Sequence, residues 1–153
     1  MRVVRIQQED FDASTVLKEL RRGRTDIGAT ATFVGYVRDL NLDDDVEAMV
    51  LEHYPGMTEK ALTEIATEAA SRWELLGTAV IHRVGELRPA DQIVLVAVAS
   101  AHRGDAFAAC EFIMDYLKTR APFWKKELLK DGASRWVEAR SSDDEAAERW
   151  NEE

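Results

Sequence analysis

The feature that most constrains the fold of this chain is a nearly unbroken apolar run, QIVLVAVASA, at residues 92–101. A strand this apolar is typical of the interior of a sheet that is covered on both faces. Residues 104–120 follow it with helical periodicity, because Phe107, Cys110, Met114 and Leu117 recur at three- and four-residue steps. The sequence therefore predicts a central strand that leads directly into a long helix.

Shorter patterned segments predict the rest of the fold. A second long helix is expected at residues 57–73, and a shorter one begins near Asp12 or Ser14. Pro122 should end the helix of residues 104–120, because the residue before a proline disfavours helix. Hairpins join strands 78–87 with 92–101 and 123–129 with 134–139, and single strands are expected at residues 3–6, 27–37 and 46–53. This mixture of hairpins and helices indicates an α+β fold rather than a doubly wound α/β fold.

Size and charge narrow the protein class. The 153 residues allow one domain at residues 1–140, followed by an acidic tail at residues 141–153. A net charge of −9 argues against nucleic acid as a partner. No apolar run is long enough to span a membrane, the first residues are too polar for a secretory signal, and a single cysteine fits a reducing compartment. We therefore expect a cytoplasmic protein.

Motifs for nucleotide binding, serine hydrolysis and zinc proteolysis are absent from the sequence. His53, His82 and His102 each lie at or near the end of a predicted strand, but their spacing is not that of zinc ligands, and we expect no bound metal. Cys110 should be a buried apolar residue rather than a reactive thiolate. Trp124 and Trp136 alternate with charged residues and are expected to anchor the core.

Basic side chains gather around the predicted turns. His102 and Arg103 lie between a strand and a helix N-terminus, where backbone N–H groups attract anions. Lys118 and Lys125 are separated by the bend at Pro122, so the chain can double back and bring both ammonium groups to one point. The same cations could instead neutralise a helix C-terminus or simply lie in solvent. The residue types alone leave both interpretations open.

Several ordered motifs resemble the large, catalytic subunit of molybdopterin synthase, the MoaE family. The likeness extends over about residues 26–139, and its specificity comes from the order and spacing of the motifs rather than from any one of them. The motifs are FVGYVR at residues 33–38, LEHYPGM at 51–57, IHRVGEL at 81–87, SAHR at 100–103, DYLKTRAPFWKKE at 115–127 and RWVEA at 135–139.

The resemblance implies an α/β-hammerhead of the α+β class, with an antiparallel sheet and hairpins packed against two long helices. It implies a homodimer that binds a small, ubiquitin-like sulfur-carrier subunit, giving a heterotetramer. It also implies a sulfurtransferase reaction, in which two sulfur atoms pass from the thiocarboxylated Gly-Gly terminus of that subunit to cyclic pyranopterin monophosphate. The product is the dithiolene of molybdopterin, and no cofactor of the subunit itself is implied.

Site residues follow where this sequence matches the family motifs. The resemblance makes Lys118 and Lys125 the catalytic lysines beside the incoming thiocarboxylate. It gives substrate binding to seven further residues, which are Tyr36, Val37, Arg38, His102, Arg103, Lys126 and Glu127. The turn at residues 89–91 departs from the family pattern, because Ala90 stands where a glycine is expected. The remaining alternatives are a non-catalytic module that binds a ubiquitin-like tail or a phosphorylated ligand, and a structural dimerisation domain.

Overall fold

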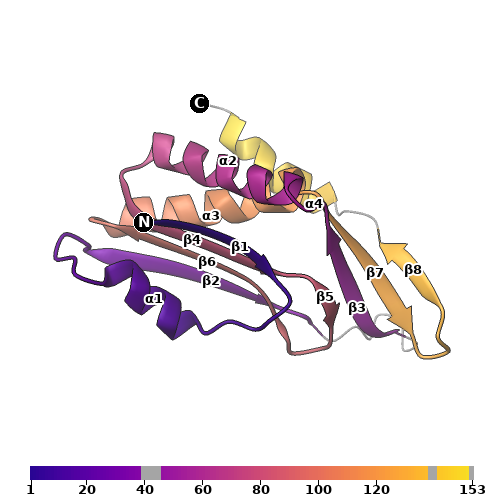
Figure 1. The fold of residues 1–153 in the computed structure, drawn as a ribbon. Helices are drawn as coiled ribbons and strands as arrows, with labels where there is room; N and C mark the ends of the chain where they lie inside the picture. Colours follow the sequence, from indigo (N-terminus) through magenta and orange to yellow (C-terminus); the bar gives the residue numbers. More distant parts are fainter. Residues whose placement is uncertain (39–45, 138–140, 152–153) are drawn as a thin grey trace.

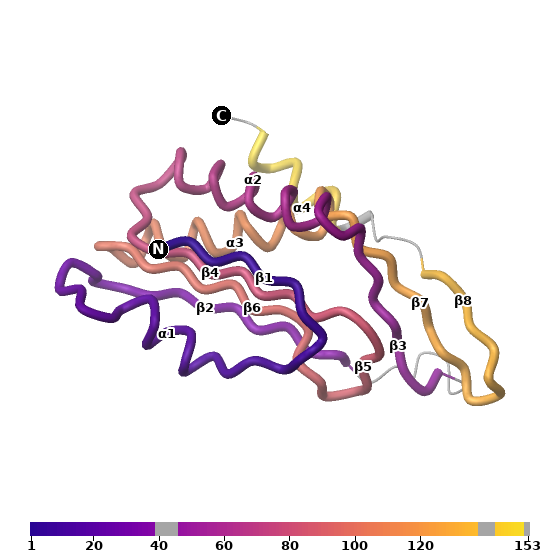
Figure 2. Tube along the Cα trace, viewed as in Figure 1, coloured from indigo at the N-terminus to yellow at the C-terminus, as the bar shows by residue number. Residues whose placement is uncertain are grey.

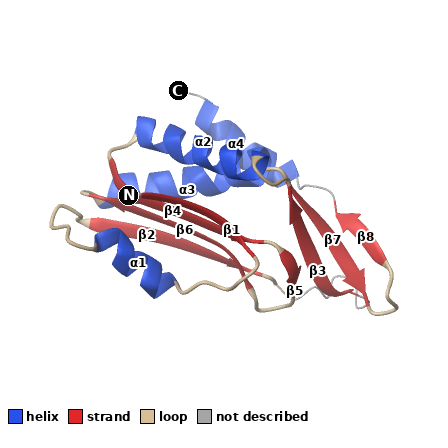
Figure 3. Ribbon diagram, in the orientation of Figure 1, coloured by secondary structure: helices blue, strands red, loops and turns tan. Residues whose placement is uncertain are grey.

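The computed structural model describes residues 1–38, 46–137 and 141–151, and in this part of the chain the strands form two four-stranded sheets (Figure 1). Sheet A has the order β1-β4-β6-β2, and sheet B has the order β5-β3-β7-β8. Figure 3 shows α2 and α3 on one side of sheet A, α1 on the other, and sheet B at one end. The elements are β1 Arg2–Gln7, α1 Ala13–Arg21, β2 Ala29–Tyr36, β3 Val46–His53, α2 Met57–Arg72, β4 Leu75–Arg83, β5 Gly85–Leu87, β6 Gln92–Ser100, α3 Arg103–Arg120, β7 Phe123–Leu129, β8 Ser134–Val137, α4 Ser141–Glu148 and the 3-10 turn η1 Arg149–Asn151.

The predicted central strand is confirmed. β6 lies between β4 and β2, and the side chains from Val94 to Ser100 are at most 2% exposed. One face of sheet A packs against Leu62, Ile65, Phe112 and other side chains of α2 and α3, and the other face packs against Leu20 of α1. β1 runs parallel to β4, so sheet A is mixed rather than wholly antiparallel as expected. The α+β class is confirmed.

The buried stripe of α3 differs from the predicted one. Cys110 and Leu117 are buried, but Phe107 is 67% exposed, and the core is instead filled by Phe112 and Ile113. α3 packs over both β6 and β2. The thiol of Cys110 donates to the carbonyl oxygen of Val96 in β6 over 3.7 Å, whereas Phe107, three residues away on α3, is left exposed. The periodicity of apolar residues predicted the helix correctly, but it could not show which face of the helix would remain exposed to solvent.

The predicted strand at residues 78–87 is broken in the structure. Gly85 has a φ of +90°, a conformation that glycine adopts without steric cost, and there the chain leaves sheet A. β5 then pairs with β3 in sheet B, as Figure 2 allows the reader to trace. The turn to β6 keeps its predicted position, with Ala90 at a φ of +77°. The N–H of Ala90 donates to the carbonyl of Val37, and the N–H of Val37 donates to the carbonyl of Asp91.

The acidic C-terminal segment forms α4 and η1, which pack on α3. The ring of Trp150 meets those of Trp73 and Phe112 edge-on, with centroids 5.7 and 5.5 Å apart. Its indole N–H donates to Asp115, and Arg149 forms ion pairs with Asp115 and Glu111. The sequence also predicts a polar loop at residues 38–45, with Leu40 and three adjacent aspartates, and all of it after Arg38 lies outside the described residues. None of the described helices is long and apolar enough to cross a membrane.

A glycine at the start of β2 provides a test of this packing. A Cβ added to Gly28 would lie 2.0 Å from the backbone carbonyl oxygen of Ala101, which no side-chain rotation can relieve. We expect Gly28→Ala to lower the free energy of unfolding by about 2–4 kcal/mol. Gly104→Ala is the control, because nothing lies within 4 Å of its added Cβ and alanine favours helix. Urea denaturation measures both, and equal stabilities would contradict the close approach of residues 28 and 101.

Candidate functional site

The turn between α3 and β7 positions the two lysines. Lys118 lies exposed in the last turn of α3, and Ala121 leaves the helix with an extended backbone before Pro122. The chain then reverses into β7, where Lys125 is half-buried and pairs with Leu51 of β3. The predicted proline bend is therefore present, and it carries the second lysine into sheet B.

The faces of β7 separate Lys125 and Glu127 from Lys126, because successive side chains of a strand point to opposite sides. Lys125 lies opposite Leu51 and Glu127 opposite Met49. Leu51 and Met49 pack with Val37 and Leu87 in the small core between the sheets. Lys125 and Glu127 therefore extend from the face of sheet B that adjoins sheet A. Glu127 accepts a hydrogen bond of 3.0 Å from Arg135 on β8.

Lys126 extends from the other face of β7. Its Nζ lies 5.1 Å from the ring centroid of Trp136, within the range of a cation–π contact. Trp136 is 58% exposed and Trp124 is 47% exposed. The prediction that these tryptophans anchor the core is wrong, because the face they occupy is open to solvent. The structure thus does not bring Lys126 to the side on which Lys125 lies.

Arg38 emerges at the same end of sheet A as the α3–β7 turn. β2 ends at Tyr36, which is exposed and pairs with Gln92 at the start of β6. Val37 is 2% exposed, and both of its backbone polar groups bond to the turn at residues 90–91. Val37 therefore fixes the chain, and the exposed Arg38 follows from this fixed point. α3 packs back along β6, so its last turn and Lys118 return to this end of the sheet.

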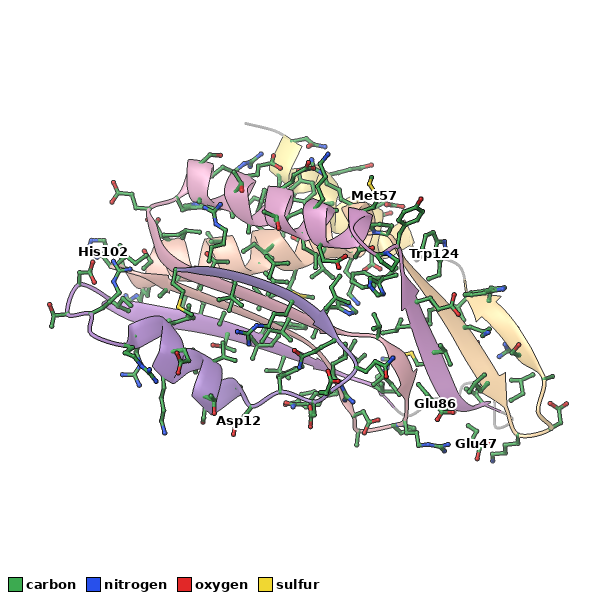
Figure 4. All side chains as sticks on the ribbon, viewed as in Figure 1. Asp12, Glu47, Met57, Glu86, His102 and Trp124 are labelled. Carbon is green, nitrogen blue, oxygen red and sulfur yellow. The ribbon has the colours of Figure 1, made fainter. Side chains whose placement is uncertain are left out.

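His102 and Arg103 lie at the other end of α3. Figure 4 shows His102 at the left end of the molecule and Trp124, the neighbour of Lys125, on the far side of α3, where sheet B begins. An α-helix rises 1.5 Å per residue, so the backbones of His102 and Lys118 are about 24 Å apart. Within one chain the structure therefore gathers Arg38, Lys118 and Lys125 at one end and places His102 and Arg103 at the opposite end.

His82 lies buried beside the lysine end of α3, and sequence reasoning gave it no role. Its ring stacks on Phe123 with centroids 3.9 Å apart, and its Nδ1 lies 2.8 Å from the carbonyl oxygen of Arg83. The pKa of His82 is lowered to about 4, mainly by burial and to a smaller extent by the positive charges of Lys118 and His53, while the hydrogen bond to Arg83 acts in the opposite direction. The feature of the sequence that could have drawn attention to His82 is its place at the end of the apolar strand segment TAVIH, residues 78–82.

Metal and thiol chemistry find little support in the described residues. Among them, no three His, Cys, Asp or Glu side chains lie close enough together to hold a metal ion. Cys110 is 7% exposed, and burial raises the pKa of its thiol to about 11. The prediction that Cys110 is a buried apolar residue is confirmed.

Comparisons with known proteins agree with this architecture. Residues 6–120 match the family model described as MoaE protein. The chain belongs to the MoaE family. The molybdopterin synthase catalytic subunit of Ralstonia nicotianae is 61% identical over 150 residues, covering 98% of this chain and 85% of that protein.

Solved structures of MoaE proteins show the same fold. The molybdopterin biosynthesis MoaE protein of Burkholderia ambifaria superimposes with a TM-score of 0.85 at 59% identity, with all of both chains covered. The molybdopterin synthase structure of Staphylococcus aureus gives a TM-score of 0.78 at 33% identity, covering 87% of this chain and 95% of that one. The predicted membership of the MoaE family is confirmed.

The buried imidazole predicts a specific loss of stability in acid. The folded protein keeps His82 neutral down to a pKa of about 4, whereas the unfolded chain binds the proton near 6.5. The contribution of the neutral His82 ring to the free energy of unfolding is therefore fully present above pH 6.5 and is lost as the pH drops toward 4. Between pH 7 and pH 5 the natural protein should lose about 2 kcal/mol more than His82→Phe. Urea denaturation at both pH values tests this, and parallel losses would assign the acid sensitivity to other groups.

Proposed function

We propose that this chain is the sulfur-transferring subunit of a molybdopterin synthase. Its substrates are cyclic pyranopterin monophosphate and the thiocarboxylated C-terminus of a small, ubiquitin-like subunit. The observation that carries the proposal is that, in a member of the MoaE family, Lys118, Lys125 and Arg38 all lie toward the same end of sheet A. The relative with 61% identity bears the name of this enzyme's catalytic subunit.

The basic groups suit both substrates. The planar guanidinium of Arg38 matches the oxygens of a cyclic phosphate, which it can contact with two parallel hydrogen bonds. The thiocarboxylate is also an anion, and charge develops as its sulfur attacks a carbon of the pterin side chain. An ammonium group close by stabilises that charge or transfers a proton. We assign proton transfer or covalent chemistry to Lys118 and electrostatic anchoring to Lys125, with Glu127 beside them.

We propose further that two copies of the chain pair through β2. In the described part of the chain the outer edge of β2 has no neighbouring strand, and its sequence ATATFVGY carries no charge and no proline. The other edge strands contain the charged residues that discourage edge pairing, namely Arg2 and Arg5 in β1, Glu86 in β5 and Arg135 in β8. Phe33 on β2 and Phe107 on α3, the helix that packs over β2, are both exposed, and the second copy would cover them.

Such a dimer would complete the site. α3 lies over β2 and runs in the same direction, so antiparallel pairing of two β2 strands sets the two α3 helices antiparallel as well. The N-terminus of one α3 then approaches the C-terminus of the other. His102 and Arg103 of one subunit would add anion-binding groups to Lys118 of its partner, which accounts for their distance of about 24 Å within one chain.

Substitution of the lysines tests the division of roles. Lys118→Ala should lower the single-turnover rate of dithiolene formation by at least about 100-fold, and Lys118→Arg should not restore it, because arginine keeps its proton at accessible pH. Lys125→Arg should retain most of the rate, since an anchor requires mainly charge. The assay uses saturating thiocarboxylated small subunit, which separates chemistry from docking. An active Lys118→Arg protein would show that Lys118 acts only through its positive charge. If Lys118→Ala weakens only the binding of the substrates, the result would favour the non-catalytic module.

Mixed dimers test the shared site. Lys118→Ala and Arg103→Ala chains, each nearly inactive alone, should form a heterodimer in which one of the two sites has all its natural residues. The purified heterodimer should therefore regain about half of the natural activity per dimer. Two differently tagged chains expressed together allow its isolation, and light scattering checks the dimer. An inactive heterodimer would show that each site is built from a single chain.

A further inference from the structure

His82 occupies the joint at which sheet A, the end of α3 and the start of β7 come together. It lies on β4, it is 4% exposed, and its ring is nearly parallel to that of Phe123, at an interplanar angle of 18°. Phe123 is the first residue of β7 and precedes Lys125 by two residues. Lys118 lies near enough for its charge to disfavour protonation of His82. One buried ring thus adjoins the elements that carry both lysines.

The ring is held by a rigid support. The carbonyl oxygen of Arg83 can only accept, so Nδ1 of His82 carries the proton and donates to it over 2.8 Å. The Arg83 guanidinium donates to the carbonyls of Gln8 and Gln92, over 3.0 and 2.9 Å. The loop after β1 and the start of β6 therefore fix the residue that orients the imidazole. A ring fixed in this way can transmit a precise position to whatever packs on it.

Phe123 is fixed on its other side as well. The hydroxyl of Thr58 donates to the carbonyl oxygen of Pro122 over 3.0 Å and accepts from the N–H of Tyr54 over 2.9 Å. Phe123 also pairs with His53, the last residue of β3. The start of β7 is therefore clamped between the β3–α2 turn and the ring of His82.

We propose that His82 is a positioning residue for sulfur transfer, which through its stack on Phe123 sets the placement of Lys125 relative to Lys118. This inference rests on the proposed function for its catalytic consequence. It assigns His82 no proton transfer, because the ring is buried and stays neutral in the range where the enzyme would work. The stacked ring surface, rather than the imidazole nitrogens, then carries the effect.

Three variants separate these contributions. His82→Ala removes the stack, His82→Phe keeps an aromatic ring but removes both nitrogens, and Phe123→Leu removes the stack from the other side. Misplacement of a reacting group by about 1 Å can cost 100-fold in rate. We expect His82→Ala and Phe123→Leu to lower the single-turnover rate by about 10- to 100-fold with little change in KM for the pterin substrate, since Arg38 is untouched. His82→Phe should stay within about threefold of the natural rate.

A second readout is independent of activity. Limiting acetic anhydride labels each lysine at a rate set by its surroundings, and mass spectrometry reads Lys118 and Lys125 relative to exposed Lys18 on α1. His82→Ala and Phe123→Leu should change the relative labelling of at least one of the pair by about threefold or more, and His82→Phe should not. Val3→Ala on β1, which packs on the opposite face of sheet A, is the control for general destabilisation, and it should change neither rate nor labelling.

The outcomes are distinct. If His82→Phe is as slow as His82→Ala although both are folded, the nitrogens act directly and the proposal is overturned. Natural labelling and rate in folded His82→Ala or Phe123→Leu would also overturn it. Should His82→Ala fail to fold, Phe123→Leu supplies the same comparison. If the natural enzyme makes no dithiolene, the proposed function fails, whereas the labelling ratios still decide whether His82 positions the lysines.

Discussion

Burial of β6 on both faces is the constraint on which the rest of the structure depends. A strand whose side chains from Val94 to Ser100 are all buried needs cover on each side, which α2 and α3 supply on one face and α1 on the other. Because α3 follows β6 directly, it covers the strand by running back along it. Its last turn must therefore return to the end of the sheet where β6 begins. The position of Lys118 at the end of sheet A where β2 also ends is a consequence of this return.

Local patterns predicted most of the elements, since each depends on its own residues. The helix of residues 57–73, the strand at residues 46–53 and the bend at Pro122 all lie as predicted. The predictions that were wrong concern features that depend on contacts with residues distant in the sequence. Gly85 permits the chain to leave sheet A, but only the presence of β3 gives β5 somewhere to pair. Phe107 has the spacing of a core residue and is nevertheless exposed, while Phe112 and Ile113 fill the core.

The candidate site shows a similar division. Family resemblance identified Lys118, Lys125, Arg38, His102 and Arg103, and the predicted helix over residues 104–120 already set the last two at the opposite end from Lys118. The length of α3 keeps His102 and Arg103 away from Lys118 of the same chain. Pairing of two chains through the uncharged edge of β2 would bring these residues together across the dimer. Lys126 likewise matches the family motif, yet the alternation of β7 places it with Trp136 on the outer face.

His82 was overlooked for a physical reason. A histidine in an apolar strand is more often a satisfied core residue than a functional one, and its sequence neighbours cannot reveal the ring of Phe123 that covers it. Burial of a titratable ring lowers stability in acid, a disadvantage that a phenylalanine at the same place would avoid. What the imidazole adds is its bond to Arg83, which fixes the rotation of the ring. The chain therefore gives up acid stability at the joint between its two sheets for a bond that ties the ring to Arg83, whereas the stack on Phe123 is a contact that a phenylalanine would also make.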